Sequence, residues 1–115
     1  MVNLSPELDS VFRALADSKR RAMIERLAQG PATIGELGEP FALTKPAVTK
    51  HVKVLERAGL LTREIDGRVH RCEIDPEPLD RAQRWVSDVR AFWEGRLDDL
   101  ADYLETVPKK KRRKP

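Results

Sequence analysis

The sequence has a single cysteine, Cys72, among its 115 residues. One thiol can form neither an internal disulfide nor a thiolate-based metal site within one chain. No run of about 18 apolar residues is present, which excludes a helix long enough to span a membrane. Residues 1–12 also lack the basic flank and the apolar centre of a secretory signal. We therefore expect a cytoplasmic protein that has no membrane partner.

The sequence also lacks the motifs of catalysis and of metal binding. No nucleophile is paired with a base and no glycine-rich phosphate loop is present, so we expect no enzymatic activity and no cofactor. The two histidines, His51 and His70, lie far apart without cysteines beside them, which does not match the spacing of metal ligands. We predict no metal site. Cys72 is expected to be a small core residue, with a redox-sensing thiol as the alternative.

Positive charge is concentrated at the end of the chain. Lysine and arginine number 22, and six of them form the run KKKRRK at Lys109–Lys114. The other 16 are fewer than the 19 acidic residues, so any surface for nucleic acid on the body must be local. We expect one domain over residues 1–107 and a disordered basic tail over residues 108–115 that adds non-specific phosphate contacts. The body is rich in arginine, whereas the tail is rich in lysine. Whether the tail is native to the domain or an appended extension therefore stays open.

Capping patterns predict three helices in the first third of the chain. Ser5-Pro6 predicts the start of one helix, and Asp17 predicts the start of a second. Thr33 and Glu36 have the spacing of a capping box, which predicts a short third helix. A glycine and a proline that follow soon after are expected to stop it.

A fourth helix is predicted within TKPAVTKHVKVLERAGLL, residues 44–61. Thr44 is a suitable N-cap, and Gly59 suits the left-handed residue after a helix. At about 100° per residue, apolar and basic side chains fall on opposite sides of this helix. The apolar side is formed by Val48, Val52 and Leu55, and the opposite side by Pro46, Lys50, Lys53 and Arg57. The pattern predicts one core face and one cationic face.

The remainder of the body is predicted to be a hairpin and a long helix. Apolar and charged residues alternate imperfectly around Asp66-Gly67, a strong signal for a two-residue hairpin turn. After Asp75-Pro76 a helix of about 28 residues is expected, since apolar residues repeat every seven positions. The repeat consists of Leu79, Val86, Trp93, Leu100 and Val107.

This order of elements indicates the fold. A short helix that leads by a tight turn into a helix with a cationic outer face is the layout of a helix-turn-helix, and a hairpin directly after it makes the arrangement winged. We therefore predict a mainly α fold with a small β-hairpin, a winged helix-turn-helix in the order α-α-α-α-β-β-α.

Three stretches carry a family resemblance: FRALADSKRRAMIERLA, LTKPAVTKHVKVLERAGLL and REIDGRVHRCEIDPEPL. Through their order and spacing, the chain from about Leu8 to Leu104 resembles the ArsR-type winged-helix repressors of bacteria, in the branch that lacks the metal-binding cysteines. The resemblance implies a homodimer, joined through the first and last helices, that binds an imperfect inverted repeat in a promoter. It also implies a bacterial protein associated with the nucleoid.

The predicted DNA contacts lie at the start of the fourth helix and on the hairpin. A helix fits the major groove, where its first side chains reach base edges and its lysines meet phosphates, and an arginine-tipped hairpin can reach the minor groove or the backbone. The predicted DNA-binding residues are Thr44, Lys45, Ala47, Thr49, Lys50, His51, Lys53, Arg63, Arg68 and Arg71. A hydrogen-bonded packing role is an equal alternative for His51. His70 is expected to be solvated or to contact phosphate.

The last helix also favours self-association. Its broad apolar stripe is more than so small a domain is expected to cover, although closure of the monomer's own core is the alternative. The predicted dimer interface consists of Leu8, Phe12, Leu79, Val86, Val89, Trp93, Leu100 and Leu104.

Together these observations predict a sequence-specific transcriptional regulator that binds double-stranded DNA, acting as a homodimeric repressor at an inverted repeat. Two alternatives stay open. One is a non-specific architectural DNA-binding protein, and the other is a repressor switched by a small apolar effector near the aromatic residues of the last helix.

Overall fold

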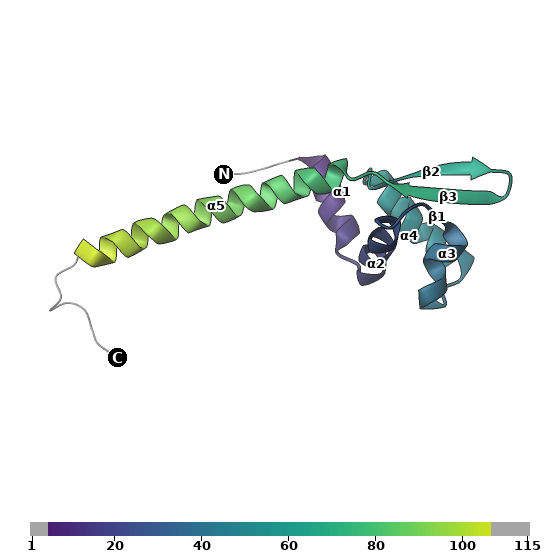
Figure 1. Cartoon of the computed structure of the whole chain (residues 1–115), viewed down its shortest axis with the longest axis horizontal. Helices are drawn as coiled ribbons and strands as arrows, with labels where there is room; N and C mark the ends of the chain where they lie inside the picture. The colour runs from purple at the N-terminus through teal and green to yellow at the C-terminus, as the bar shows by residue number, and fades with distance from the viewer. Residues whose placement is uncertain (1–4, 107–115) are drawn as a thin grey trace. The chain divides into compact units, whose positions relative to one another are not determined.

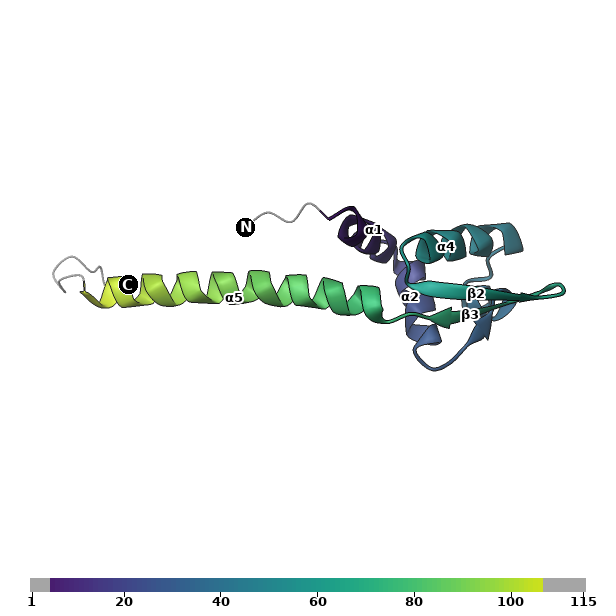
Figure 2. The ribbon, with the colours of Figure 1, turned by 90° about the horizontal axis from the view of Figure 1, so that it is seen from above.

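The computed structural model describes residues 5–106, whose helices and strands are shown in Figures 1 and 2. This part of the chain divides after Ala82 into a first and a second compact unit. The first unit contains α1 (Pro6–Leu15), α2 (Ser18–Leu27), β1 (Ala32–Thr33), α3 (Ile34–Gly38), the 3₁₀ helix η1 (Glu39–Phe41), α4 (Lys45–Arg57), β2 (Leu61–Asp66) and β3 (Val69–Ile74). The last helix, α5 (Glu77–Thr106), begins in the first unit and forms the described part of the second. The mainly α, winged helix-turn-helix fold is confirmed.

Capping hydrogen bonds confirm the predicted helix starts. Ser5 Oγ accepts from a first-turn N–H of α1 at 3.2 Å, and Asp17 Oδ1 accepts from a first-turn N–H of α2 at 2.8 Å. At α3 the capping box is complete, because Thr33 Oγ1 accepts from the Glu36 N–H at 3.2 Å while Glu36 Oε1 accepts from the Thr33 N–H at 2.9 Å. Each cap satisfies a backbone donor that a helix start would otherwise leave without a partner.

The turn between α3 and α4 depends on a close contact. Gly38 ends α3 as predicted, and a Cβ atom there would collide with the side chain of Val48 in α4. The chain continues as η1. Pro40 is compatible with this helix because it lies in the first turn, where a missing N–H is harmless. Ala42 then turns the chain with a φ of 52°, a left-handed conformation that L-residues other than glycine rarely adopt. This turn places the start of α4 beside α3.

The sheet has three strands, one more than predicted. β1 pairs with β3 and β3 with β2, both antiparallel, so that the strand order is β1-β3-β2. The sequence gives no signal for β1, because two residues are too few to show an alternating pattern. Its pairing attaches the start of α3 to the hairpin.

The hairpin turn lies one residue later than predicted. Asp66 pairs with Val69, so the two-residue turn consists of Gly67 and Arg68 rather than of Asp66 and Gly67. Gly67 has a φ of 62° and Arg68 has no positive φ, which is typical of a type II′ turn with glycine at its first central position. Arg68 therefore lies at the tip of the hairpin, as predicted.

The predicted core face of α4 is confirmed. Val48, Val52 and Leu55 are at most 2 % exposed, and α4 is contacted by α1, α2, α3 and β2. The other large buried side chains of this core are Val11, Met23, Leu27, Leu37, Leu60, Leu61 and Cys72. Burying an aliphatic side chain of this size contributes about 1.5–3 kcal/mol. Val48, Val52 and Leu55 therefore fix the rotation of α4 about its axis, so that its opposite face points outward.

The described part of the second unit, residues 83–106, is one helix. Seven of its large apolar side chains are between 47 and 65 % exposed, namely Val86, Phe92, Trp93, Leu97, Leu100, Tyr103 and Leu104, whereas Trp85 and Val89 are half-buried. α5 has 30 residues, slightly more than predicted. Val107, the last predicted repeat position, and the predicted basic tail over residues 108–115 lie outside the described residues.

Candidate nucleic-acid interface

The start of α4 presents short polar side chains whose orientation is fixed by the backbone. Thr44 Oγ1 accepts from the Ala47 N–H at 3.3 Å, and the Thr49 hydroxyl donates to the Lys45 carbonyl oxygen at 2.9 Å. The Thr49 hydrogen is therefore engaged within the helix, which leaves its methyl group and an oxygen lone pair for an outside partner. Thr44 and Lys45 are exposed, whereas Ala47 and Thr49 are half-buried.

Two lysines continue the cationic face of α4. Lys50 and Lys53 are exposed, and within residues 5–106 neither forms a salt bridge with an acidic side chain. The first turn of α4 contains no acidic residue that would repel an anion. The outward face of this helix thus offers two exposed lysines that form no salt bridge with the described residues.

A hollow of about 350 Å³, which we call the basic groove, lies between the start of α4 and the hairpin. It is lined by Thr33, Ile34, Gly35, Lys45, Thr49, Arg63, Arg68, Val69 and His70. Three of these side chains are cations and a fourth is a histidine. A cleft lined by one sign of charge concentrates ions of the opposite sign. The structure therefore brings together four of the predicted DNA-binding residues, which are Lys45, Thr49, Arg63 and Arg68.

Arg63 has a structural role beside its place in the groove. Its Nη2 donates to Glu56 Oε1 of α4 at 2.8 Å, and its side chain is only 14 % exposed. Its Nη1 lies 3.4 Å from His70 Nδ1. These contacts connect β2 to β3 and to α4, so Arg63 holds the hairpin against the helix.

Arg71 is separated from the other predicted residues. Successive side chains of a strand point to opposite faces, so Arg71 faces away from His70, which lines the basic groove. It lies opposite Glu64 of β2 and Thr33 of β1. Hydrogen bonds from Thr33 lower the pKa of the Glu36 carboxyl, and the charge of Arg71 contributes to a smaller extent. Arg71 thus lies among carboxylates on the other face of the sheet.

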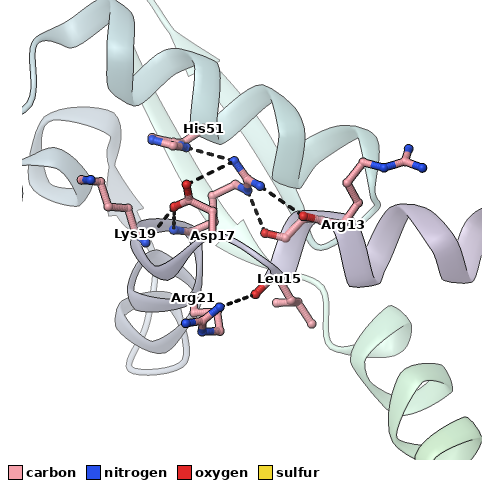
Figure 3. Close-up of polar contacts among 8 residues, drawn as sticks. Arg13, Leu15, Asp17, Lys19, Arg21 and His51 are labelled. Atoms are coloured by element: carbon pink, nitrogen blue, oxygen red, sulfur yellow. Dashed lines mark hydrogen bonds and ion pairs between the residues drawn. The ribbon is translucent and has the colours of Figure 1, made fainter.

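His51 has a partner that no sequence pattern predicts. Its Nδ1 lies 3.4 Å from Nη1 of Arg20 in α2 (Figure 3). Arg20 also donates to the carbonyl oxygens of Ala14 and Arg13 at 2.7 and 3.1 Å. The hydrogen-bonded packing role considered for His51 is therefore present. Because the partners of Arg20 lie in different elements, no local sequence pattern joins them.

Cys72 is a core residue, as predicted. It is 0 % exposed, and burial raises the pKa of its thiol, which keeps the thiol protonated. Among residues 5–106, no group of three or more His, Cys, Asp or Glu side chains is placed to hold a metal ion. No helix in the same range is both long enough and apolar enough to cross a membrane.

The predicted dimer residues differ in their exposure. Phe12, Val86, Trp93, Leu100 and Leu104 are exposed, Leu79 and Val89 are half-buried, and Leu8 is 9 % exposed within the core of the first unit. In the second unit, Phe92 and Trp93 meet edge to face with ring centroids 5.9 Å apart. The Arg96 guanidinium lies 5.7 Å from the Phe92 centroid. Most of the predicted residues thus have apolar area available for a partner.

The tight turn into a cationic helix, together with the hairpin beside that helix, defines a winged helix-turn-helix DNA-binding protein. Residues 15–64 match the family described as "Helix-turn-helix domain". The HTH-type transcriptional regulator Rv2034 of Mycobacterium tuberculosis is 36 % identical over 98 residues, which cover 85 % of this chain and 89 % of that protein. The transcriptional repressor SdpR of Bacillus subtilis is 25 % identical over 79 residues, which cover 69 % of this chain and 88 % of that one.

Two solved structures of transcriptional regulators are also similar to this chain. The crystal structure of an ArsR family transcriptional regulator superposes with a TM-score of 0.77 and 38 % identity, covering 82 % of this chain and 97 % of that one. An ArsR-like transcriptional regulator from Rhodococcus sp. RHA1 gives a TM-score of 0.74 and 27 % identity, covering 88 % of this chain and 95 % of that one. The chain belongs to the ArsR family of helix-turn-helix transcriptional regulators, which are DNA-binding proteins and not enzymes.

Proposed function

We propose that this protein is a homodimeric repressor that recognises an inverted repeat in a promoter through α4. One observation carries the proposal. Val48, Val52 and Leu55 hold one side of α4 in the core at no more than 2 % exposure, while Lys50 and Lys53 lie exposed on the other side. A helix held in this way can enter a major groove about 12 Å wide without uncovering the core.

The first turns of α4 supply the proposed base contacts. Thr44 and Lys45 reach the backbone or a base edge, because first-turn side chains of a recognition helix point toward the groove floor. Ala47 and Thr49 are small, so the helix can approach closely, and the Thr49 methyl can pack on a thymine methyl. These residues set sequence preference.

The proposed phosphate contacts come from both sides of the groove. Lys50 and Lys53 reach the phosphates of the two DNA strands that border the major groove around α4. His51 lies beside these lysines. Arg68 at the hairpin tip extends the contact to the neighbouring backbone or minor groove. Arg63 contributes mainly by holding the hairpin in place, because Glu56 already binds its guanidinium, and Arg71 contributes least because it lies on the other face of the sheet.

The exposed stripe of the second unit supports the proposed homodimer. Seven large apolar side chains at 47 to 65 % exposure are more than a helix on the surface of a globular protein usually leaves uncovered. An isologous dimer would cover the stripes of two copies by packing them together. Its two-fold axis would relate two recognition helices, which is why we expect an inverted repeat with half-sites about one DNA turn, roughly 34–36 Å, or a multiple of it apart.

Repression is the proposed direction of regulation because of the relatives. SdpR is named a transcriptional repressor, and a second Bacillus subtilis relative, 33 % identical over 70 residues, is named an arsenical resistance operon repressor. A dimer bound across a promoter would block polymerase. We place this activity at the bacterial nucleoid, in the cytoplasm, because that is where promoter DNA lies.

Selection from a random DNA pool tests the proposal. The protein should enrich one inverted repeat, and competition between that site and random DNA should give an affinity ratio above about a thousandfold. Thr49→Ala should change the selected bases, whereas Lys53→Ala should weaken binding to all sequences alike. A ratio near one, with both variants behaving alike, would contradict sequence recognition and favour the architectural DNA-binding alternative.

A further inference from the structure

Both histidines of the chain lie in the same kind of environment. His51 Nδ1 is 3.4 Å from Nη1 of Arg20, and His70 Nδ1 is 3.4 Å from Nη1 of Arg63. Both imidazoles are half-buried. One histidine belongs to α4 and the other to the hairpin, so each of the two elements proposed to contact DNA has one arginine-histidine pair.

The arginines cannot turn away easily, because other groups hold them. Arg20 donates to two carbonyl oxygens at the end of α1 and lies 3.9 Å from Asp17 Oδ2. Arg63 donates to Glu56 Oε1 at 2.8 Å. The two guanidinium side chains are only 16 and 14 % exposed. Each histidine therefore meets a guanidinium whose position is set by the fold.

The chemistry of this contact selects one form of the imidazole. A guanidinium is always protonated and can only donate. The nitrogen that faces it must therefore be an acceptor, which leaves the single proton of a neutral imidazole on Nε2. An N–H at Nδ1 would face a second donor and lose the hydrogen bond.

The other nitrogen of each ring is available to an outside group. Within residues 5–106, the hydrogen bond of each ring is made by Nδ1, and Nε2 forms none. Figure 3 shows one ring nitrogen of His51 in the arginine contact and the other directed away from it. His70 lines the basic groove together with Lys45 and Arg68. An outward N–H beside cations suits a phosphate oxygen.

We propose that Arg20 and Arg63 are positioning residues that hold His51 and His70 as their Nε2–H tautomers, so that α4 and the hairpin each direct one neutral N–H donor at a DNA phosphate. The second half of this statement rests on the proposed function, whereas the tautomers concern the protein alone. A neutral donor differs from a lysine in one measurable respect. It adds affinity without releasing a counterion, so its loss leaves the salt dependence of binding unchanged.

The tautomers can be measured directly by long-range ¹H–¹⁵N NMR of ¹⁵N-histidine-labelled protein at alkaline pH, where imidazoles are neutral. In the wild type, both rings should show an unprotonated Nδ1 and a protonated Nε2. In Arg20→Met, His51 should change to the averaged pattern of an imidazole that exchanges both tautomers, while His70 stays unchanged. Arg63→Met should give the reverse. A protonated Nδ1 in the wild type at either ring overturns the proposal for that ring, and this result does not depend on whether the variants fold.

Arg21 provides a matched control for Arg20. It lies next in the sequence and donates to the Leu15 carbonyl oxygen at 2.7 Å, also at the end of α1 (Figure 3), but it has no hydrogen bond to a histidine. Arg21→Met should therefore leave both tautomers as in the wild type. If it changes His51 as much as Arg20→Met does, the effect is a general loss of packing and the positioning role is refuted.

Binding to the selected DNA site tests the phosphate contact. The amide nitrogen of glutamine can take the place of Nε2, whereas that of asparagine reaches only about as far as Nδ1. His51→Asn should weaken binding about tenfold, with an unchanged salt slope, and His51→Gln should recover most of the loss. Equal affinity of His51→Asn and wild type would refute the contact and leave the tautomer result standing. If the wild type itself binds no DNA, the proposed function fails and the tautomer measurement still decides the role of the arginines.

Discussion

α4 and the helix of residues 83–106 both carry an apolar stripe on a charged helix, but only the stripe of α4 is covered. Val52 and Leu55 are 0 % exposed, whereas Trp93 is 59 % and Leu100 is 52 % exposed. The first stripe finds its partners within its own unit, and this fixes which face of α4 points outward. Within residues 83–106 the second stripe is left exposed, as we expect of the dimer surface proposed above.

The covered stripe contributes to the stability of the fold, whereas the uncovered stripe is proposed to contribute to dimer affinity. Changes in the two stripes should therefore alter different measured quantities. A change in the covered stripe should alter the free energy of unfolding. A change in the uncovered stripe should alter the dissociation constant of the dimer, and a change on the outward face of α4 should alter only DNA binding.

Leu55→Ala should have the largest effect. Removing a fully buried leucine side chain should lower the free energy of unfolding by about 2–5 kcal/mol, because transfer free energy is lost and a cavity remains. Urea unfolding followed by circular dichroism measures this change. Lys53→Ala, on the outward face of the same helix, is the control and should stay within about 0.5 kcal/mol of the wild type. Equal effects of the two changes would contradict the assigned faces of α4.

Trp93→Ala should come next. A large aromatic side chain at the centre of an interface commonly contributes about 2 kcal/mol or more, so the dimer dissociation constant should rise at least about thirtyfold. Sedimentation equilibrium measures it. Ser87→Ala, a polar exposed position on the same helix, should leave the constant unchanged. A wild type that sediments as a monomer at micromolar concentration would contradict the homodimer altogether.

A double variant, Lys50→Ala with Lys53→Ala, should weaken DNA binding without destabilising the fold. Each lysine that meets a phosphate contributes about one unit to the slope of log affinity against log salt, so the slope should fall by about two. Fluorescence anisotropy over a series of salt concentrations gives the slope. An unchanged slope would place the phosphate contacts elsewhere.

Cys72 should give the smallest effect, which appears only at high pH. Burial raises the pKa of the folded thiol, so the unfolded thiol, with an ordinary pKa of about 8.5, loses its proton first. The contribution of the buried Cys72 thiol to the free energy of unfolding is therefore fully present below the pKa of the thiol in the unfolded chain. It is lost as pH rises toward the pKa of the thiol in the folded protein.

Between pH 7.5 and 9.5 the urea midpoint of the wild type should fall more than that of Cys72→Ala, because the variant lacks this ionisation. Other groups that titrate in this range are shared by both proteins and cancel in the comparison. Parallel pH profiles would show that the thiol is not buried in the core of the folded protein.

The sequence predicts the parts of the fold that depend on local chemistry. Ser5, Asp17 and Thr33 mark helix starts because a cap and its partner lie within three residues of each other. Val48, Val52 and Leu55 identify the inner face of α4 because helical periodicity is regular. The outward face of the candidate site follows from the same periodicity.

The parts that escape prediction depend on contacts between distant elements. β1 exists only because two residues lie against β3, and the place of Arg71 follows from strand register, which a one-residue shift of the turn alters. The Arg20–His51 and Arg63–Glu56 contacts join residues from different elements. Composition and spacing show that these residues are charged but not which neighbour each one meets.

An NMR titration of the full chain with its selected DNA site tests the central claim most directly. If α4 is the recognition helix, the largest changes in backbone amide shifts should fall on residues 44–53, smaller ones should fall on the hairpin tip at Arg68, and the buried positions Val52 and Leu55 should keep their side-chain contacts. Tight binding that leaves residues 44–53 unperturbed would contradict the account.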